Sequence, residues 1–185
     1  MAIRKVARMG HPVLREPARP LSEADVRTPE FQRLIDDMLD TMADYQGIGL
    51  AAPQVYEGLR VFVAGSDPDA SIGDMTDAGR MPLIALVNPE ITPVGRAVEV
   101  DWEGCLSIPD IRGEVPRARD ITVRALDREG RRVEFSASGF PARVIQHETD
   151  HLDGVLFFDR MRSFETLTFL EEYQRYWARA DEDEA

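Results

Sequence analysis

The sequence of residues 146–154 is QHETDHLDG, which contains an HExxH element formed by His147, Glu148 and His151. On a helix, the four-residue spacing brings both imidazoles to one face and places Glu148 beside the first of them. Two imidazoles placed in this way can hold a divalent metal ion, and the carboxylate can act as a general base. The alternative is a pair of surface histidines on a polar helix face.

The residues around this element predict a helix over residues 138–154. Ser138 is a plausible cap at its start, and Gly154 suits the left-handed conformation that closes many helices. Val144 is apolar, but one turn later Glu148 stands where an apolar residue would continue the pattern. This break in the pattern favours a chemical function for the glutamate.

The rest of the chain predicts further helices and strands. Apolar residues recur at helical spacing after Pro29, which predicts an N-terminal helix over residues 28–47. Short β-branched and apolar runs predict strands at residues 59–64, 83–87, 97–102, 121–125 and 132–136. The polar residues 66–81 are predicted to form a loop, and residues 164–180 a C-terminal helix.

These elements predict an α+β fold. We expect antiparallel β-sheets packed around a central helix that bears the HExxH element, with an N-terminal helix and a C-terminal helix. A length of 185 residues lies within the usual range for one domain, so residues 1–185 are expected to form a single catalytic domain. Its last residues, 181–185, are expected to be an acidic, frayed tail.

The composition, with 43% hydrophobic and 30% charged residues, is that of a globular protein. A formal net charge of −12 repels phosphate backbones and anionic lipids, so direct binding to nucleic acid or to a membrane is not expected. The single cysteine cannot form an internal disulfide. Nothing therefore calls for an oxidising compartment, and we expect a cytoplasmic protein. No apolar run has the length of a signal peptide or a membrane span, so the mature form is expected to be the whole chain.

A catalytic metal held by two imidazoles needs a third protein ligand if it is to keep one open position. His11, the remaining histidine, precedes a proline in the extended first segment and is expected to be structural or exposed. Cys105 is the better candidate, because it follows a predicted strand and a glycine in the sequence EGCLS, where a bend can turn the thiol into a cleft. Taken alone, such a cysteine is more often a buried packing residue.

A further segment, GIGLAAPQ at residues 47–54, has two glycines in three residues, followed by small side chains and an amide. Small residues let another part of the chain approach closely, and Gln54 could donate a hydrogen bond to a developing oxyanion. Taken alone, the segment would be better interpreted as a glycine-rich turn after a helix. It lacks the Lys-Ser/Thr ending of a phosphate-binding loop.

Together and in this order, the three segments resemble the signature motifs of the peptide deformylases, which are GIGLAAPQ at residues 47–54, EGCLS at residues 103–107 and QHETDHLDG at residues 146–154. The similarity extends through residues 8–161. The resemblance implies an enzyme that removes the N-formyl group from the initiator methionine of newly made polypeptides and releases formate. Its substrates would be N-formyl-methionyl nascent polypeptides and water.

The resemblance also implies roles for single residues. The implied metal ligands, which leave a water molecule in the fourth position, are Cys105, His147 and His151. Glu148 would stay off the metal and transfer protons, while the side-chain amide of Gln54 and the backbone N–H of Leu106 would stabilise the tetrahedral state. The residues implied to bind the peptide are Ile48, Gly49, Arg112, Phe140 and Val144.

Ligand chemistry and the family resemblance favour different metals. A thiolate and two imidazoles with an open position suit a tetrahedral zinc hydrolase. The family is typically most active with ferrous iron, so we predict one Fe²⁺ per chain, which Zn²⁺ or Ni²⁺ can replace.

Two alternative functions remain at this point. An HExxH metalloprotease commonly completes its site with a histidine or a glutamate, and a non-catalytic metal-binding module would want a fourth protein ligand. The acidic C-terminal segment leaves attachment to the ribosome through that segment in doubt, because RNA would repel it.

Overall fold

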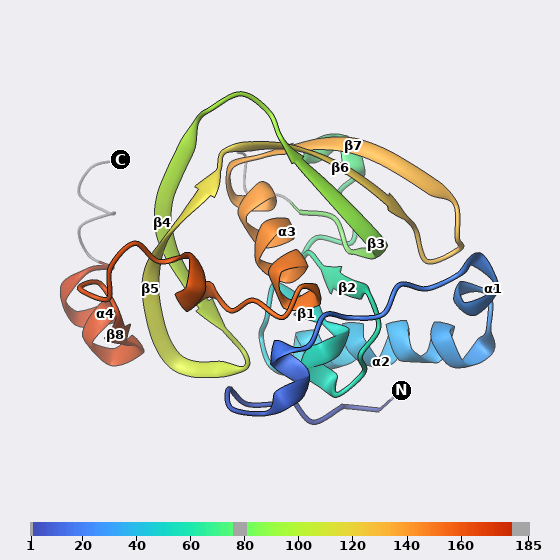
Figure 1. The fold of residues 1–185 in the computed structure, drawn as a ribbon, viewed down its shortest axis with the longest axis horizontal. Helices are drawn as coiled ribbons and strands as arrows, with labels where there is room; N and C mark the ends of the chain where they lie inside the picture. The colour runs from blue at the N-terminus through green and yellow to red at the C-terminus, as the bar shows by residue number, and fades with distance from the viewer. Residues whose placement is uncertain (1, 76–80, 179–185) are drawn as a thin grey trace.

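A computed structural model describes residues 2–75 and 81–178 of the chain. Its α-helices are α1 (Glu23–Val26), α2 (Pro29–Asp44), α3 (Gly139–Leu152) and α4 (Leu170–Tyr176), and its 3-10 helices are Pro12–Arg15, Ala52–Val55, Ile72–Asp74 and Phe157–Arg160 (Figure 1). Its strands are β1 (Gly49–Ala51), β2 (Val61–Ala64), β3 (Ile84–Pro93), β4 (Val98–Cys105), β5 (Ile108–Ala118), β6 (Asp120–Leu126), β7 (Arg132–Ser138) and β8 (Thr168–Phe169).

The described strands form two antiparallel sheets. One sheet has the strand order β1-β2-β3-β6-β7, and the other has the order β4-β5-β8. In the second sheet, β4 and β5 form a long hairpin whose pairing runs from Val98 opposite Ala118 to Cys105 opposite Ile108. The mixture of helices and antiparallel sheets predicted from the sequence is therefore confirmed. Among the described residues, no helix is long and apolar enough to cross a membrane.

Helix α3 lies against strands of both sheets, because it contacts β1, β2, β6 and β7 of one and β5 of the other (Figure 1). Its residues Ala142, Ile145 and Leu152 are fully buried, and they pack in one core cluster with Phe62 of β2. The two histidines of the HExxH element lie on another face of the helix, between Ile145 and Leu152 in sequence. The core thus fixes the face that the two histidines present.

The two ends of α3 are close to those predicted. Ser138 occupies the position before the helix, but its side chain makes no capping hydrogen bond, because its hydroxyl donates to Asp120 Oδ1 at 2.7 Å. The helix ends at Leu152, and Gly154 has a φ of 73°. A Cβ at Gly154 would lie 2.6 Å from the carbonyl oxygen of Arg15, so both the conformation and the space there require glycine.

Helix α2 packs on β1 and β2 in a separate core cluster. It begins after Thr28, whose hydroxyl accepts a hydrogen bond from the backbone N–H of Phe31 at 3.2 Å, and Pro29 occupies its first turn. Its buried residues, which follow the predicted helical spacing, are Phe31, Leu34, Ile35, Met38, Thr41 and Met42. The helix ends at Asp44, slightly before the predicted end at Gly47.

Several parts of the structure differ from the sequence prediction, among them strand β1 and the second half of β3 (residues 88–93), which were not predicted as strands. The sequence predicts no strand at β5, which pairs along its length with β4. The C-terminal helix is predicted to begin at residue 164, but Thr168–Phe169 pair with β5 and α4 begins only at Leu170. The predicted acidic tail lies outside the described residues, as do residues 76–80 of the predicted loop at residues 66–81.

Candidate active site

Three potential metal ligands meet between β4 and α3. Cys105 is the last residue of β4, and His147 and His151 lie one turn apart on α3. One ligand atom from each residue lies within 4.8 Å of the others, and Cys105 Sγ is 3.2 Å from His151 Nε2. Cys105 and His151 are buried, while 11% of the His147 side chain is exposed. The third ligand inferred from the sequence therefore lies beside both histidines.

The alternation of strand β4 explains how Cys105 and Glu103 both reach α3. Residues two apart in a strand point to the same side, and both residues are buried. The pairing of β4 with β5 is irregular between them, and such irregularities often re-aim side chains beside active sites. Gly104 leaves room for the guanidinium of Arg112, because a Cβ there would lie 2.7 Å from Arg112 Nε.

The donor set fits a divalent transition metal such as zinc or ferrous iron. Burial raises the pKa of the Cys105 thiol, but the charge of His151 and hydrogen bonds with both histidines lower this pKa well below its usual value. The thiolate is the form that binds metals. Glu148 Oε2 is buried without a hydrogen-bond partner among the described residues, as expected where a ligand or water belongs.

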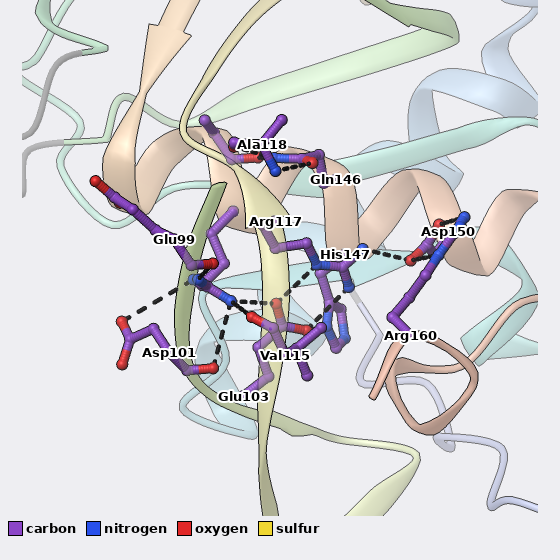
Figure 2. A network of polar contacts seen from close by, with 12 residues as sticks. Glu99, Asp101, Glu103, Val115, Arg117, Ala118, Gln146, His147, Asp150 and Arg160 are labelled. Carbon is purple, nitrogen blue, oxygen red and sulfur yellow. Dashed lines mark hydrogen bonds and ion pairs between the residues drawn. The ribbon is translucent and has the colours of Figure 1, made fainter. Parts of the chain in front are cut away.

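Glu103 orients the first histidine, and sequence reasoning did not assign it this role. Its Oε2 is 2.9 Å from His147 Nδ1, which leaves Nε2 of the imidazole free for a metal. Arg117 donates two hydrogen bonds to the Glu103 carboxylate, at 2.8 and 3.0 Å (Figure 2). Arg143 donates a third at 2.9 Å. Burial opposes ionisation of Glu103, but the hydrogen bonds from Arg117 and His147 hold its pKa far below the usual range.

The buried ion pairs continue from Arg117 to the surface. Arg117 Nη1 lies 2.5 Å from Asp150 Oδ2, and Arg160 pairs with the same carboxylate at 2.7 Å (Figure 2). Asp150 belongs to the HExxH segment, next to His151. Buried charges are tolerated when they are paired and hydrogen-bonded, as each of these is. The network therefore ties α3 to the β4–β5 hairpin behind the metal ligands.

Glu148 lies on the cavity side of α3, next to β1. A Cβ on Gly49 would lie 2.6 Å from Glu148 Cδ, so only glycine lets the carboxylate take this position. Burial raises the pKa of Glu148 to about 7, although the charges of His147 and His151 oppose this shift. A buried carboxyl with a raised pKa is typical of a group that transfers protons.

Gln54 is buried with its amide held in one orientation. Its Oε1 accepts a hydrogen bond from the backbone N–H of Ala51 at 2.8 Å, which directs Nε2 the other way. Nε2 donates to Ser107 Oγ at 3.1 Å and lies 3.5 Å from Cys105 Sγ. A donor is therefore fixed beside the candidate metal centre, in a place suited to a developing oxyanion.

A cavity of about 570 Å³ opens over these groups. The residues singled out from the sequence that line it are Ile48, Gly49, Gln54, Cys105, Leu106, Arg112, Phe140, Val144, His147 and Glu148. His151 is not among its lining residues. His11 lies elsewhere, where its Nδ1 accepts a hydrogen bond from Val13 N at 3.2 Å and caps a 3-10 helix, so its predicted structural role is confirmed.

The cavity also has lining residues that sequence reasoning did not find. Arg143 lies one turn before His147 on α3, and its buried guanidinium also donates to the carbonyl oxygen of Val115 at 2.8 Å. Trp102 of β4 and Leu170 of α4 line the cavity as well. Trp102 and Leu170 come from segments distant in sequence, so no local pattern pointed to them, whereas the position of Arg143 four residues before His147 was a local signal that could have been used.

Comparisons with known proteins point to one family. The sequence model of the polypeptide deformylase family matches residues 3–166. A relative from Prochlorococcus marinus, peptide deformylase 1, is 43% identical over 175 residues, which cover 94% of this chain and 88% of the relative. A ligand-bound class I type b peptide deformylase from Acinetobacter baumannii superposes with a TM-score of 0.79 at 39% identity, covering 87% of this chain and 100% of that chain. A crystal structure of the Acinetobacter enzyme bound to Met-Ala-Ser superposes with a TM-score of 0.77 at 39% identity, covering 86% and 100% of the two chains.

Proposed function

The chain belongs to the polypeptide deformylase family, and we propose that the cavity between α3, β4 and residues 47–54 is the active site in which it acts. The enzyme removes the N-formyl group from newly made polypeptides. Water is consumed, the C–N bond of the formamide breaks, and formate and a free amino terminus are released. The observation that carries the assignment of the site is the meeting of Cys105, His147 and His151 with Glu148 in this region.

One divalent metal ion would be held by Cys105 Sγ and by one imidazole nitrogen each of His147 and His151. The family is metal-dependent, and these residues form a group that could hold a metal. The bound metal would polarise the formyl oxygen and lower the pKa of water. Glu103 supports this arrangement, because its hydrogen bond fixes the ring of His147.

Glu148 would act first as general base and then as general acid. Its carboxylate takes a proton from the attacking water and delivers one to the amine nitrogen as the C–N bond breaks. Its pKa of about 7, raised by burial, suits a group that must accept and donate a proton near neutral pH.

Negative charge gathers on the formyl oxygen as water adds to the carbon. The side-chain amide of Gln54 and the backbone N–H of Leu106 are the proposed donors to this oxygen. Gln54 is pre-organised for the role, because its Oε1 is already occupied by the backbone N–H of Ala51. Leu106 directly follows Cys105 and lines the same cavity.

The peptide would bind along β1 with its methionine side chain in the cavity. Strand β1 is at the edge of its sheet, so the backbone at Gly49 can pair with an added strand. Ile48, Phe140 and Val144 supply apolar surface for the methionine side chain. Arg112 would lie near the following part of the peptide.

A protease and a structural metal site are the alternatives, and the site favours neither. A thiolate third ligand is not the histidine or glutamate that HExxH proteases commonly use. The ligand group found among the described residues contains three side chains, whereas a closed structural site would want four.

The test compares two substrates on metal-loaded, anaerobically purified enzyme. Formate release from a formyl-methionyl peptide should be fast, and cleavage of internal bonds in the unformylated peptide should be slow. The variant Glu148→Gln should keep its metal and lose orders of magnitude in turnover, because it keeps the shape and deletes the proton acceptor. Comparable cleavage of both peptides, or near-normal turnover by the variant, would contradict these roles.

We propose Fe²⁺ as the active metal. The expected result of reconstituting stripped enzyme with Fe²⁺, Ni²⁺ or Zn²⁺ is higher formate release with Fe²⁺ than with Zn²⁺. Brief peroxide should inactivate the ferrous form, by oxidation of the iron or of the thiolate. Equal activity with Zn²⁺, unchanged by peroxide, would overturn the iron assignment and leave the ligands in place.

The wider setting of the enzyme is also a proposal. We propose that residues 1–185 form one cytoplasmic catalytic domain in which both sheets pack around the helix that bears the HExxH element. The net charge of −12 supports a polypeptide substrate and argues against direct binding of nucleic acid or anionic lipid.

A further inference from the structure

We propose that Trp102 and Leu170 form an apolar wall at one end of the active-site cavity, and that this wall binds the side chains that follow the formyl-methionine. The inference rests on the proposed function, because it concerns which nascent polypeptides the same site prefers. Both residues line the cavity of about 570 Å³ that is also lined by Cys105 and Glu148. A cavity of this size accommodates ligands larger than one amino-acid side chain.

The C-terminal segment, residues 168–177, is fixed to the hairpin that carries the metal ligand. Strand β8 pairs with β5, and Thr168 lies opposite Arg112, which itself lines the cavity. Figure 1 shows β8 and α4 beside the β4–β5 hairpin. This pairing places Leu170, the residue that follows β8, at the cavity.

Trp102 is the second point at which the segment is held. Its ring centroid lies 4.8 Å from that of Tyr173 and 5.6 Å from that of Trp177. Helix α4 has only seven residues and buries none of them, and a helix this short is not stable in water by itself. Its position therefore depends on the pairing of β8 with β5 and on Trp102, which lines the cavity.

Two further apolar residues of the same C-terminal segment are exposed. Phe169 is 63% exposed and Trp177 is 47% exposed. Scattered apolar residues are normal on a surface, but apolar residues gathered beside a cavity mark a binding site. A chain with a net charge of −12 repels RNA, whereas an uncharged polypeptide is not repelled. The occupant that fits is the part of the nascent polypeptide just after the methionine, with apolar side chains.

The test uses formyl-Met-Leu-Leu-amide and formyl-Met-Ala-Ala-amide. Wild-type enzyme should prefer the leucine peptide in kcat/KM on the order of tenfold, because part of each leucine side chain leaves water. Leu170→Ala should reduce this preference to roughly two- to threefold. Leu167→Ala is the matched control, since this exposed leucine of the same C-terminal region does not line the cavity, and it should keep the wild-type preference.

A second readout is the inhibition constant of the two reaction products, Met-Leu-Leu-amide and Met-Ala-Ala-amide. The leucine product should bind more tightly to wild type, and Leu170→Ala should lose most of this difference. An equal preference in wild type, or a preference that survives in Leu170→Ala, would overturn the inference alone. Absence of formate release from both peptides would instead overturn the proposed function, and the inference with it.

Discussion

The substitution Glu103→Ala should weaken metal binding and lower the stability of the fold together, because one carboxylate serves both. Glu103 accepts two hydrogen bonds from Arg117, one from Arg143 and one from His147. The substitution removes all four hydrogen bonds, and the buried guanidinium groups of Arg117 and Arg143 each lose one charged partner. Its effects on metal and on folding can be measured separately.

The structure sets the size of each effect. Removing one partner of a buried ion pair costs about 3–5 kcal/mol. The lower end applies here, because Arg117 keeps Asp150 at 2.5 Å and Arg143 keeps the carbonyl oxygen of Val115 at 2.8 Å. About 3 kcal/mol is still a large part of the stability of an ordinary domain, which is about 5–15 kcal/mol. No other bond to His147 Nδ1 is recorded among the described residues, so metal affinity should fall by the roughly 10–100-fold typical of such losses.

The assay is urea unfolding of the metal-free protein, paired with metal affinity measured by chelator competition without oxygen. The matched control is Glu134→Ala, because Arg124 donates two hydrogen bonds to Glu134 at 3.0 and 3.2 Å in the same paired manner. That pair is exposed, so water screens it and its loss should change neither quantity measurably. Wild-type metal affinity and an unchanged unfolding midpoint in Glu103→Ala would refute the reasoning.

Three further outcomes are expected. Gln54→Ala should lower kcat by roughly 100–1,000-fold, the usual effect of losing an oxyanion donor, and a change confined to KM would count against that role. Gly49→Ala should lower kcat by about a hundredfold through displacement of Glu148, whereas Gly58→Ala, where a Cβ meets nothing within 4 Å, should be neutral in the same assay. Burial raises the pKa of Asp127, but hydrogen bonds from Arg131 lower it overall, so this carboxylate stabilises the fold above its unfolded pKa of about 4 and loses that effect as the pH falls. The difference in unfolding free energy between wild type and Asp127→Asn should therefore be largest at neutral pH and should shrink as the pH falls below about 4. A difference that does not change with pH would contradict this prediction.

The sequence predicted correctly those elements whose local residue pattern determines their local structure. Pro29 and the helical spacing of apolar residues predicted α2, and the spacing of His147 and His151 predicted a shared helix face. Glu103 could also have been found, because it lies two residues before Cys105 on one strand and must share its side. The hydrogen-bond partners of Glu103 could not have been predicted, since Arg117 and Arg143 come from distant segments.

Strand β5 was missed because its inward positions do not hold typical core residues. Its buried positions include Gly113 and Arg117 as well as Val115. Gly113 leaves room for the end of the Met161 side chain, since a Cβ there would lie 2.9 Å from the Met161 sulfur. Arg117 is buried because Glu103 and Asp150 neutralise it. Because tertiary contacts allow glycine and arginine at buried positions, β5 lacks the alternation of apolar and polar residues by which strands are recognised in sequence.

The start of α4 was misplaced for a related reason. Leu167, Leu170, Tyr173 and Trp177 follow helical spacing, which predicted a helix from residue 164. Pairing of Thr168 and Phe169 with β5 prevents the helix from starting before Leu170. Tyr173 and Trp177 pack against Trp102, which is far away in sequence.

The contact between Gly49 and Glu148 leads to a last prediction. These residues belong to two different motifs, and the space between them is too small for a side chain on residue 49. A Cβ on Gly49 would lie 2.6 Å from Glu148 Cδ, so alanine there must push the carboxylate away. Glu148→Asp shortens the side chain by one methylene and withdraws the carboxylate from the position that the added methyl group would occupy. Each single substitution should lower kcat/KM.

The double variant Gly49→Ala, Glu148→Asp should then cost less than the sum of the two single effects, because the clash that makes Gly49→Ala harmful is already relieved. The four proteins, each loaded with the same metal, are compared by kcat/KM for a formyl-methionyl peptide, converted to free energies. A coupling of at least about 0.5 kcal/mol is expected for residues in direct contact. Strictly additive losses would show that Gly49 acts through something other than the place it leaves for the general base.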